Sequence, residues 1–158
     1  MVQSLKALQD VLSAAHPDFQ FDDGTNPSYS WRMAAPQTVL IVEDDAELRR
    51  LYSHSLLMAG FVVREARGGF EALQKVDSDP PNIVVLDLSL PGLDGFTVQA
   101  ELAAHAHTRS IPIVVVTGTT GNLDDLDVAC LLRKPVTPDG LVVAVKKCLA
   151  SGAGSAGS

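Results

Sequence analysis

The sequence predicts a doubly wound α/β domain built on an open parallel sheet of five strands. Short apolar runs occur at residues 39–42, 61–63, 83–86, 113–116 and 130–132. These runs are continuous rather than alternating, which is typical of strands covered on both faces. Helical patterns lie between them. The alternation of strands and helices favours right-handed crossovers within one parallel sheet.

The helices are predicted from apolar stripes and from residues that begin or end a helix. The first helix follows Asp45 and ends at Gly60, the second ends before Pro80, the third covers about 95–105, and the last begins after Thr137 as N-cap. The predicted buried faces are Leu48, Leu51, Tyr52, Ser55 and Leu56 in the first, Phe70, Leu73 and Val76 in the second, and Leu141, Val145, Cys148 and Leu149 in the last.

The chain of 158 residues favours one domain with additions at both ends. Residues 1–36 form an N-terminal extension, in which Leu5, Leu8 and Leu12 indicate a short helix followed by a linker. This extension is either a disordered leader or a helix that pairs with another subunit or packs on the domain. Residues 37–150 form the domain. Residues 151–158 form a flexible Gly-Ser tail, either a linker towards an output domain or a cloning remnant.

The composition argues against several classes of function. The net charge of −7 and the lack of clustered cations disfavour direct nucleic-acid binding, and the pairs Arg49–Arg50 and Lys146–Lys147 are expected on solvated helix faces. No apolar run is long enough to span a membrane. Cys130 and Cys148 are expected as buried free thiols, and His105 and His107 as a solvated helix end rather than a metal site.

Chemically active side chains follow four of the predicted strands. Glu43, Asp44 and Asp45 follow the first strand, and Asp87 follows the third, just before a Pro-Gly turn. Thr117 and Lys134 follow the fourth and fifth. Because ligands bind at the carboxyl ends of strands in open α/β sheets, these residues are expected to form one site.

Three carboxylates in a small volume require a cation or raised pKa values. Two unit charges 4 Å apart repel by about 4 kcal/mol at an effective dielectric of 20. Carboxylate oxygens in a half-solvated pocket suit Mg²⁺. A strand-end Asp beside this metal can attack phosphorus, and an ammonium such as that of Lys134 can neutralise the transferring group. Thr117 can donate its hydroxyl to a phosphoryl oxygen, and Gly118 leaves room for that group.

Four segments of the chain, in this order and strand context, resemble the receiver domain of two-component response regulators. They are Val-Leu-Ile-Val-Glu-Asp-Asp (39–45), Val-Leu-Asp-Leu-Ser-Leu-Pro-Gly-Leu-Asp-Gly (85–95), Ile-Pro-Ile-Val-Val-Val-Thr-Gly (111–118) and Lys-Pro (134–135). The resemblance covers residues 38–150. It implies a flavodoxin-like sheet of order 2-1-3-4-5 in a cytoplasmic signalling protein.

The resemblance also implies the role of each site residue. Asp87 is the phosphoacceptor for a histidine kinase or histidine phosphotransfer protein. Glu43, Asp44, Asp87 and the backbone carbonyl of Ser89 are the Mg²⁺ ligands, Asp45 is a helix N-cap, and Thr117 and Lys134 contact the phosphoryl group. Downstream proteins are expected to bind the face made by the family's fourth helix, fifth strand and fifth helix; a homodimer is left open.

Two departures from the family bear on signalling. Leu131 stands where receivers usually carry Tyr or Phe, so the usual coupling between threonine and aromatic ring is in question. Thr117 and Lys134 are only 17 positions apart, and the segment 119–127 is rich in Gly, Asn and Asp. The family's fourth helix is therefore expected to be short or absent, and this segment to be a mobile loop with an altered output surface.

Two other functions compete with the phosphorylation switch. A pseudo-receiver would use the fold as a protein-interaction module without phosphorylation, and the two departures above favour it. A hydrolase of the haloacid dehalogenase type also uses a strand-end Asp and Mg²⁺. It needs a second Asp two positions later, where this chain has Ser89.

Overall fold

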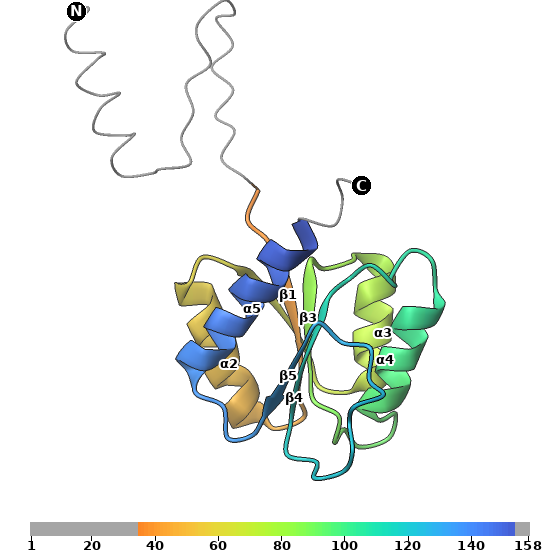
Figure 1. Ribbon diagram of the computed structural model, residues 1–158. Helices are drawn as coiled ribbons and strands as arrows, with labels where there is room; N and C mark the ends of the chain where they lie inside the picture. Colours follow the sequence, from red (N-terminus) through yellow and green to blue (C-terminus); the bar gives the residue numbers. More distant parts are fainter. Residues whose placement is uncertain (1–34, 154–158) are drawn as a thin grey trace, which may run out of the picture. The chain divides into compact units, whose positions relative to one another are not determined.

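The structure is a computed structural model that describes residues 35–153 (Figure 1). The elements are β1 (Thr38–Val42), α2 (Ala46–Met58), β2 (Val62–Ala66), α3 (Gly69–Ser78), β3 (Ile83–Leu86), α4 (Gly95–Ala104), β4 (Ile113–Thr117), β5 (Cys130–Arg133) and α5 (Pro138–Ala153). The expected N-terminal helix at 5–12, the linker as far as residue 34, and residues 154–158 of the tail lie outside the described residues. Within 35–153, no helix is long and apolar enough to cross a membrane.

All strands of the sheet are parallel, and their order is β2-β1-β3-β4-β5, as predicted. β1 lies between β2 and β3, with Val39 opposite both Val63 and Ile83. β4 pairs with β3 and with β5. Every strand therefore points its carboxyl end to the same edge of the sheet, where the predicted site residues follow.

Helices cover both faces of the sheet, with α2 and α5 on one face and α3 and α4 on the other (Figure 1). Successive residues of a strand point to opposite faces, so β1 supplies Val39 and Ile41 to one apolar core and Leu40 and Val42 to the other. These side chains are almost completely buried. Burial on both faces explains why the central strands read as continuous apolar runs.

The helix ends follow the predicted signals. The Asp45 carboxylate accepts hydrogen bonds from the N–H groups of Glu47 and Leu48 and so caps α2. At the other end, Gly60 has a φ of +97°, and the N–H groups of Gly60 and Phe61 donate to the carbonyls of Leu57 and Leu56. This is a Schellman motif, in which the left-handed residue is usually glycine.

Some predictions of burial and length were wrong. Leu51 and Phe70 were placed on buried helix faces but are 45% and 74% exposed, while Arg49, expected in solvent, is only 8% exposed. Arg49 is buried because it hydrogen-bonds to backbone and to Glu65, so polarity alone did not indicate exposure. β2 runs further than predicted, and α5 continues to Ala153, into the segment expected to be a tail.

The connection between β4 and β5, residues 118–129, contains no helix, as predicted from its length and composition. It nevertheless packs against the sheet. Leu123 is buried, and Leu126 and Val128 contact the same core. On β5, Leu131 and Arg133 point to this side and are exposed, because no helix covers the end of the sheet there.

Cys148 is a buried free thiol on α5, and burial together with the neighbouring Cys130 raises its pKa to about 11 from 9.0. At pH 8 we therefore expect about a hundredfold less Cys148 thiolate in the native protein than in the unfolded chain. Alkylation by iodoacetamide, assigned by mass spectrometry, should be slowed at least that much by folding. Because the folded pKa is raised, this thiol's contribution to stability is complete below pH 9 and is lost as the pH rises towards 11.

Native alkylation of Cys148 at the rate found in urea would contradict this burial. Cys130, which is half-buried on the edge strand, provides an internal comparison and is expected to react faster than Cys148.

Gly95, at the start of α4, packs directly on the backbone that carries Asp87. A Cβ atom at this position would lie 2.5 Å from the Cα of Leu88 and still closer to the carbonyl oxygen of Asp87. Both are backbone atoms, so the helix would have to move. We expect Gly95→Ala to lower the free energy of unfolding by about 3 kcal/mol, measured by urea denaturation. Gly118→Ala is the control, because its Cβ would meet no atom within 4 Å; equal losses in the two variants would contradict the packing argument.

Candidate functional site

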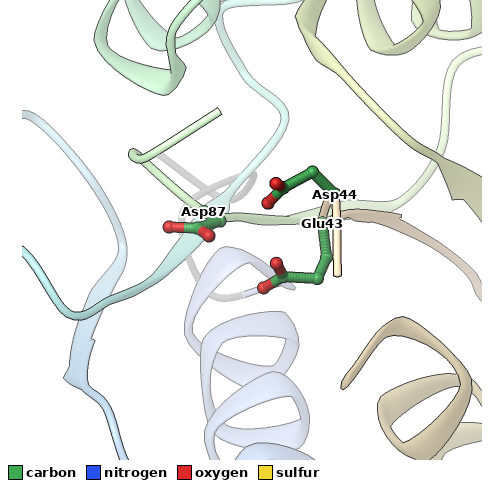
Figure 2. Close-up of side chains that lie close together, drawn as sticks. All are labelled: Glu43, Asp44 and Asp87. Carbon is green, nitrogen blue, oxygen red and sulfur yellow. The ribbon is translucent and has the colours of Figure 1, made fainter. Parts of the chain in front are cut away.

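Three carboxylates converge at the carboxyl edge of the sheet. Glu43 and Asp44 follow β1, Asp87 follows the neighbouring β3, and the Asp87 N–H donates to the carbonyl of Val42 at 3.0 Å. One ligand oxygen from each carboxylate lies within 4.8 Å of the others (Figure 2). In residues 35–153 this is the one group of three or more potential ligand residues that converges in this way. Glu43 and Asp87 are buried, whereas Asp44 is exposed.

Lys134 brings the positive charge of the site. Its Nζ lies 2.9 Å from Oε2 of Glu43 and 3.1 Å from Oδ2 of Asp87. Partial burial of the ammonium lowers its pKa, but the hydrogen bonds to both carboxylates outweigh this, and the net pKa is raised. Lys134 is therefore fully protonated at neutral pH and joins the ends of β1, β3 and β5. Its bond to Pro135 is a cis peptide.

Burial dominates the electrostatics of Glu43. Removal of the carboxylate from water raises its pKa, and the nearby charge of Asp87 raises it further, against the opposing effect of Lys134. The net direction is upward, because burial of the Glu43 carboxylate outweighs the hydrogen bonds from Lys134 and from the Asp45 N–H.

Backbone N–H groups fix the direction of both buried carboxylates. The Ser89 N–H donates to Oδ1 of Asp87 at 3.0 Å, and the Asp45 N–H donates to Oε1 of Glu43 at 3.2 Å. Each carboxylate therefore has one oxygen held by backbone and the other directed towards Lys134. This arrangement fixes the orientation of Asp87 before any ligand arrives.

Thr117 ends β4 and is completely buried. Its carbonyl accepts the N–H of Lys134 at 2.9 Å, which ties the two strand ends together. Its hydroxyl donates to Oγ1 of Thr119 and accepts the Thr119 N–H, both at 3.1 Å. Gly118, next to it, is exposed, and the protein's own packing leaves room there for a side chain.

Arg49 of α2 binds the backbone of the acidic loop, residues 43–45, that follows β1. Its Nη1 donates to the carbonyl of Glu43 at 2.9 Å and contacts that of Asp44 at 3.4 Å, while its Nε pairs with Glu65 of β2 at 3.2 Å. The Ser53 hydroxyl also donates to the Glu65 carboxylate. These contacts fix the backbone from which the carboxylates of Glu43 and Asp44 project.

The structure thus brings Glu43, Asp44, Asp87 and Lys134 into one cluster and places Thr117 on the adjacent strand end. Sequence reasoning missed Arg49, Thr119 and Arg133, which support the cluster without belonging to it. Arg49 could have been found, because it lies three, four and seven positions before the buried residues Tyr52, Ser53 and Leu56. Thr119 and Arg133 had no such signal, because their contacts depend on the path of the β4–β5 connection.

This geometry can hold a small hard cation and a charged group beside Asp87. The carboxylate oxygens are suitable ligands for a divalent cation, and the exposed Asp44 side leaves the cluster open to solvent. Lys134 and the Thr117 hydroxyl add donors from the neighbouring strand ends. The fold and the cluster define a doubly wound α/β domain with an acidic pocket at the carboxyl edge of its sheet.

Comparison with known proteins identifies this class. The response regulator receiver domain matches residues 39–146. The chain belongs to this family, whose expected function is phosphorylation-controlled signalling in two-component systems. Receiver domains normally bind Mg²⁺ at an acidic pocket, and this chain has such a pocket.

Individual relatives agree with this assignment. The chain is 30% identical to the transcriptional regulatory protein GltR of Pseudomonas aeruginosa over 118 residues, which are 72% of this chain and 49% of that protein. It is 41% identical over 101 residues to protein-glutamate methylesterase/protein-glutamine glutaminase 5 of Myxococcus xanthus, covering 63% of this chain and 28% of that protein. The chain therefore spans half or less of the length of these relatives.

Among solved structures, the chemotaxis response regulator CheY4 of Vibrio cholerae is similar, with a TM-score of 0.67 and 25% identity. The similarity covers 72% of this chain and 98% of that one. Almost the whole of CheY4 is thus matched, which agrees with the receiver-type order of strands in the described residues.

Lys134 is expected to stabilise the domain by partly neutralising the two buried carboxylates. We expect Lys134→Met to lower the free energy of unfolding by about 2 kcal/mol at pH 7 in EDTA, less than for a fully buried pair because the lysine is 22% exposed. The variant should regain stability as the pH falls. The pKa of Glu43 is already raised and rises further without the lysine, so the folded state takes up a proton where the unfolded state does not.

Urea denaturation at several pH values measures both effects. Lys146→Met, at an exposed position of α5, is the matched control and should change little. A Lys134 variant with the stability and pH dependence of the control would show that the ion pairs contribute nothing.

Proposed function

We propose that Asp87 accepts a phosphoryl group from a histidine kinase or a histidine phosphotransfer protein, in a reaction that requires Mg²⁺. The observation that supports this most directly is the cluster itself. The Asp87 carboxylate is oriented by a backbone N–H, contacts the Lys134 ammonium, and lies beside two further carboxylates. Receiver-family membership supplies the reaction class.

The residues present fit Mg²⁺. One oxygen from each of Glu43, Asp44 and Asp87 lies close to the others, and Asp44 is exposed, so a cation has access to the cluster from solvent. We assign these three carboxylates and the backbone carbonyl of Ser89 as ligands. When bound, the metal would supply positive charge to the transferring phosphoryl oxygens.

The chain's own groups have separate parts in the transfer. A carboxylate oxygen of Asp87 attacks phosphorus and forms an acyl phosphate, while the phosphorus–nitrogen bond of the donor phosphohistidine breaks and its electron pair stays on the imidazole. Lys134 offsets the charge that accumulates on the phosphoryl group. The Thr117 hydroxyl donates a hydrogen bond to one of its oxygens. No turnover of an external substrate is expected.

The geometry supports this function better than the pseudo-receiver. That interpretation depended on Leu131 and on the short β4–β5 connection, and neither removes a residue from the cluster. Both departures lie on the side through which a phosphorylated receiver would act on other proteins. They bear on the output of the domain rather than on the chemistry at Asp87.

We further propose that a downstream protein binds the face formed by the β4–β5 connection, β5 and α5. Leu131 of β5 is 36% exposed and Val143 of α5 is 64% exposed, and the cations Lys146 and Lys147 lie on the same helix. A homodimer could use this face as well. Residues 37–150 are proposed as the receiver domain of a cytoplasmic protein that does not contact nucleic acid directly through this domain.

The proposed reaction predicts one phosphoryl group per chain after incubation with acetyl phosphate and Mg²⁺. Intact-mass spectrometry should show the added phosphoryl group, and EDTA should prevent it. Asp87→Asn should abolish the label, because an amide cannot form the acyl phosphate. Asp94→Asn is the matched control, since this exposed carboxylate only caps α4 through the N–H of Thr97. Equal labelling of wild type and Asp87→Asn would place the phosphoacceptor elsewhere.

A further inference from the structure

Thr119 lies in the β4–β5 connection, and its hydroxyl links this connection to the site. Its Oγ1 accepts a hydrogen bond from the Thr117 hydroxyl at 3.1 Å and lies 3.0 Å from Oγ of Ser89. Its N–H donates to Oγ1 of Thr117 at 3.1 Å. One residue thus touches the end of β4 and the loop that follows Asp87.

Arg133, at the end of β5, holds the same segment from the other side. Its guanidinium donates to the carbonyl of Thr119 and contacts that of Gly121 at 3.4 Å. The next residue, Lys134, contacts Asp87, and its N–H donates to the Thr117 carbonyl. Residues 119–121 are therefore held by hydrogen bonds both to the Thr117 hydroxyl and to β5, the exposed edge strand of the sheet.

A hydroxyl group has one proton, and this limits Thr117. In the described state that proton is directed to Thr119, and the oxygen accepts the Thr119 N–H. If the Thr117 hydroxyl instead donates its hydrogen bond to a phosphoryl oxygen on Asp87, the hydrogen bond from this hydroxyl to Oγ1 of Thr119 is lost. Thr117 is completely buried, so in this conformation its hydroxyl bonds to Thr119 rather than to solvent.

We propose that Thr119 and Arg133 form a latch that transmits phosphorylation from the site to the β4–β5 connection and β5. In the unmodified protein the latch is closed by the Thr117–Thr119 hydrogen bonds. In the phosphorylated protein the Thr117 side chain turns towards the phosphoryl group, and residues 119–121 lose their hydrogen bonds to Thr117. The hydrogen bonds between these residues and Arg133 then change, and with them the exposed surface of β5 beside Leu131. The latch rests on the proposed function at Asp87 and supplies the relay that an aromatic residue at position 131 would otherwise give.

The latch makes a reciprocal prediction. If binding at Asp87 opens the latch, then breaking the latch must favour binding at Asp87 by the same factor. One neutral hydrogen bond corresponds to about a fivefold change in an equilibrium constant. We therefore expect Thr119→Val, which keeps the shape and removes the hydroxyl, to bind beryllium trifluoride with Mg²⁺ about fivefold more tightly than wild type.

Amide hydrogen exchange by NMR on the full chain reads the same equilibrium directly, because the Thr119 N–H is itself bonded to Thr117. In wild type, beryllium trifluoride with Mg²⁺ should speed exchange at Thr119 about fivefold or more. In Thr119→Val without the probe, the amide at position 119 should already exchange faster. Arg133→Gln, at an exposed residue, should also tighten probe binding and provides a second variant if Thr119→Val folds poorly.

Thr120→Val is the matched control. Thr120 is exposed, and its hydroxyl makes no hydrogen bond with any other residue of 35–153, so probe affinity and exchange at Thr119 should stay as in wild type. Wild-type protein that binds the probe with no change at Thr119, or folded latch variants with unchanged or weaker affinity, would overturn the latch alone. Wild-type protein that does not bind the probe would overturn both the latch and the phosphoacceptor site.

Discussion

The interaction on which the rest of this domain depends is the joint burial of Glu43 and Asp87 at one end of the sheet, opposed by Lys134. Two carboxylates in a small, poorly solvated space repel each other strongly, and one ammonium leaves that repulsion only partly compensated. The raised pKa of Glu43 is the local sign of this imbalance. Receiver domains normally bind Mg²⁺ at an acidic pocket of this kind.

The surrounding structure maintains this arrangement at several points. Parallel pairing of β1 with β3 places the two carboxylates side by side, and Gly95 allows α4 to pack against the Asp87 backbone. Arg49 fixes the carbonyls of the acidic loop by reaching from α2 towards β2. The position of the two carboxylates is therefore held by strand pairing, by the packing of α4 and by the hydrogen bonds of Arg49.

On the other side of the site, the absence of a helix between β4 and β5 alters how the domain can communicate. A helix would satisfy its own backbone groups, whereas the extended connection leaves carbonyls that Arg133 contacts. The connection is thus held by a few side-chain hydrogen bonds and by three apolar residues on the core. Individual side-chain hydrogen bonds can break without unfolding the connection. This suits a segment whose hydrogen bonds change when a phosphoryl group is added to Asp87.

By itself, the sequence determined the parallel strands, the helix caps, and the gathering of Glu43, Asp44, Asp87 and Lys134 at one edge of the sheet with Thr117 on the adjacent strand end, because apolar runs, Asp45, Gly60 and strand-end polar residues are local signals with fixed structural meaning. The strand order was implied by the resemblance of the chain's segments to the receiver family. The sequence did not determine the burial of Arg49, the exposure of Phe70 or the contacts of Thr119 with Arg133. Those depend on which carbonyls and which neighbouring helix meet each side chain in three dimensions, and residues distant in the chain supply these partners only after the sheet has assembled.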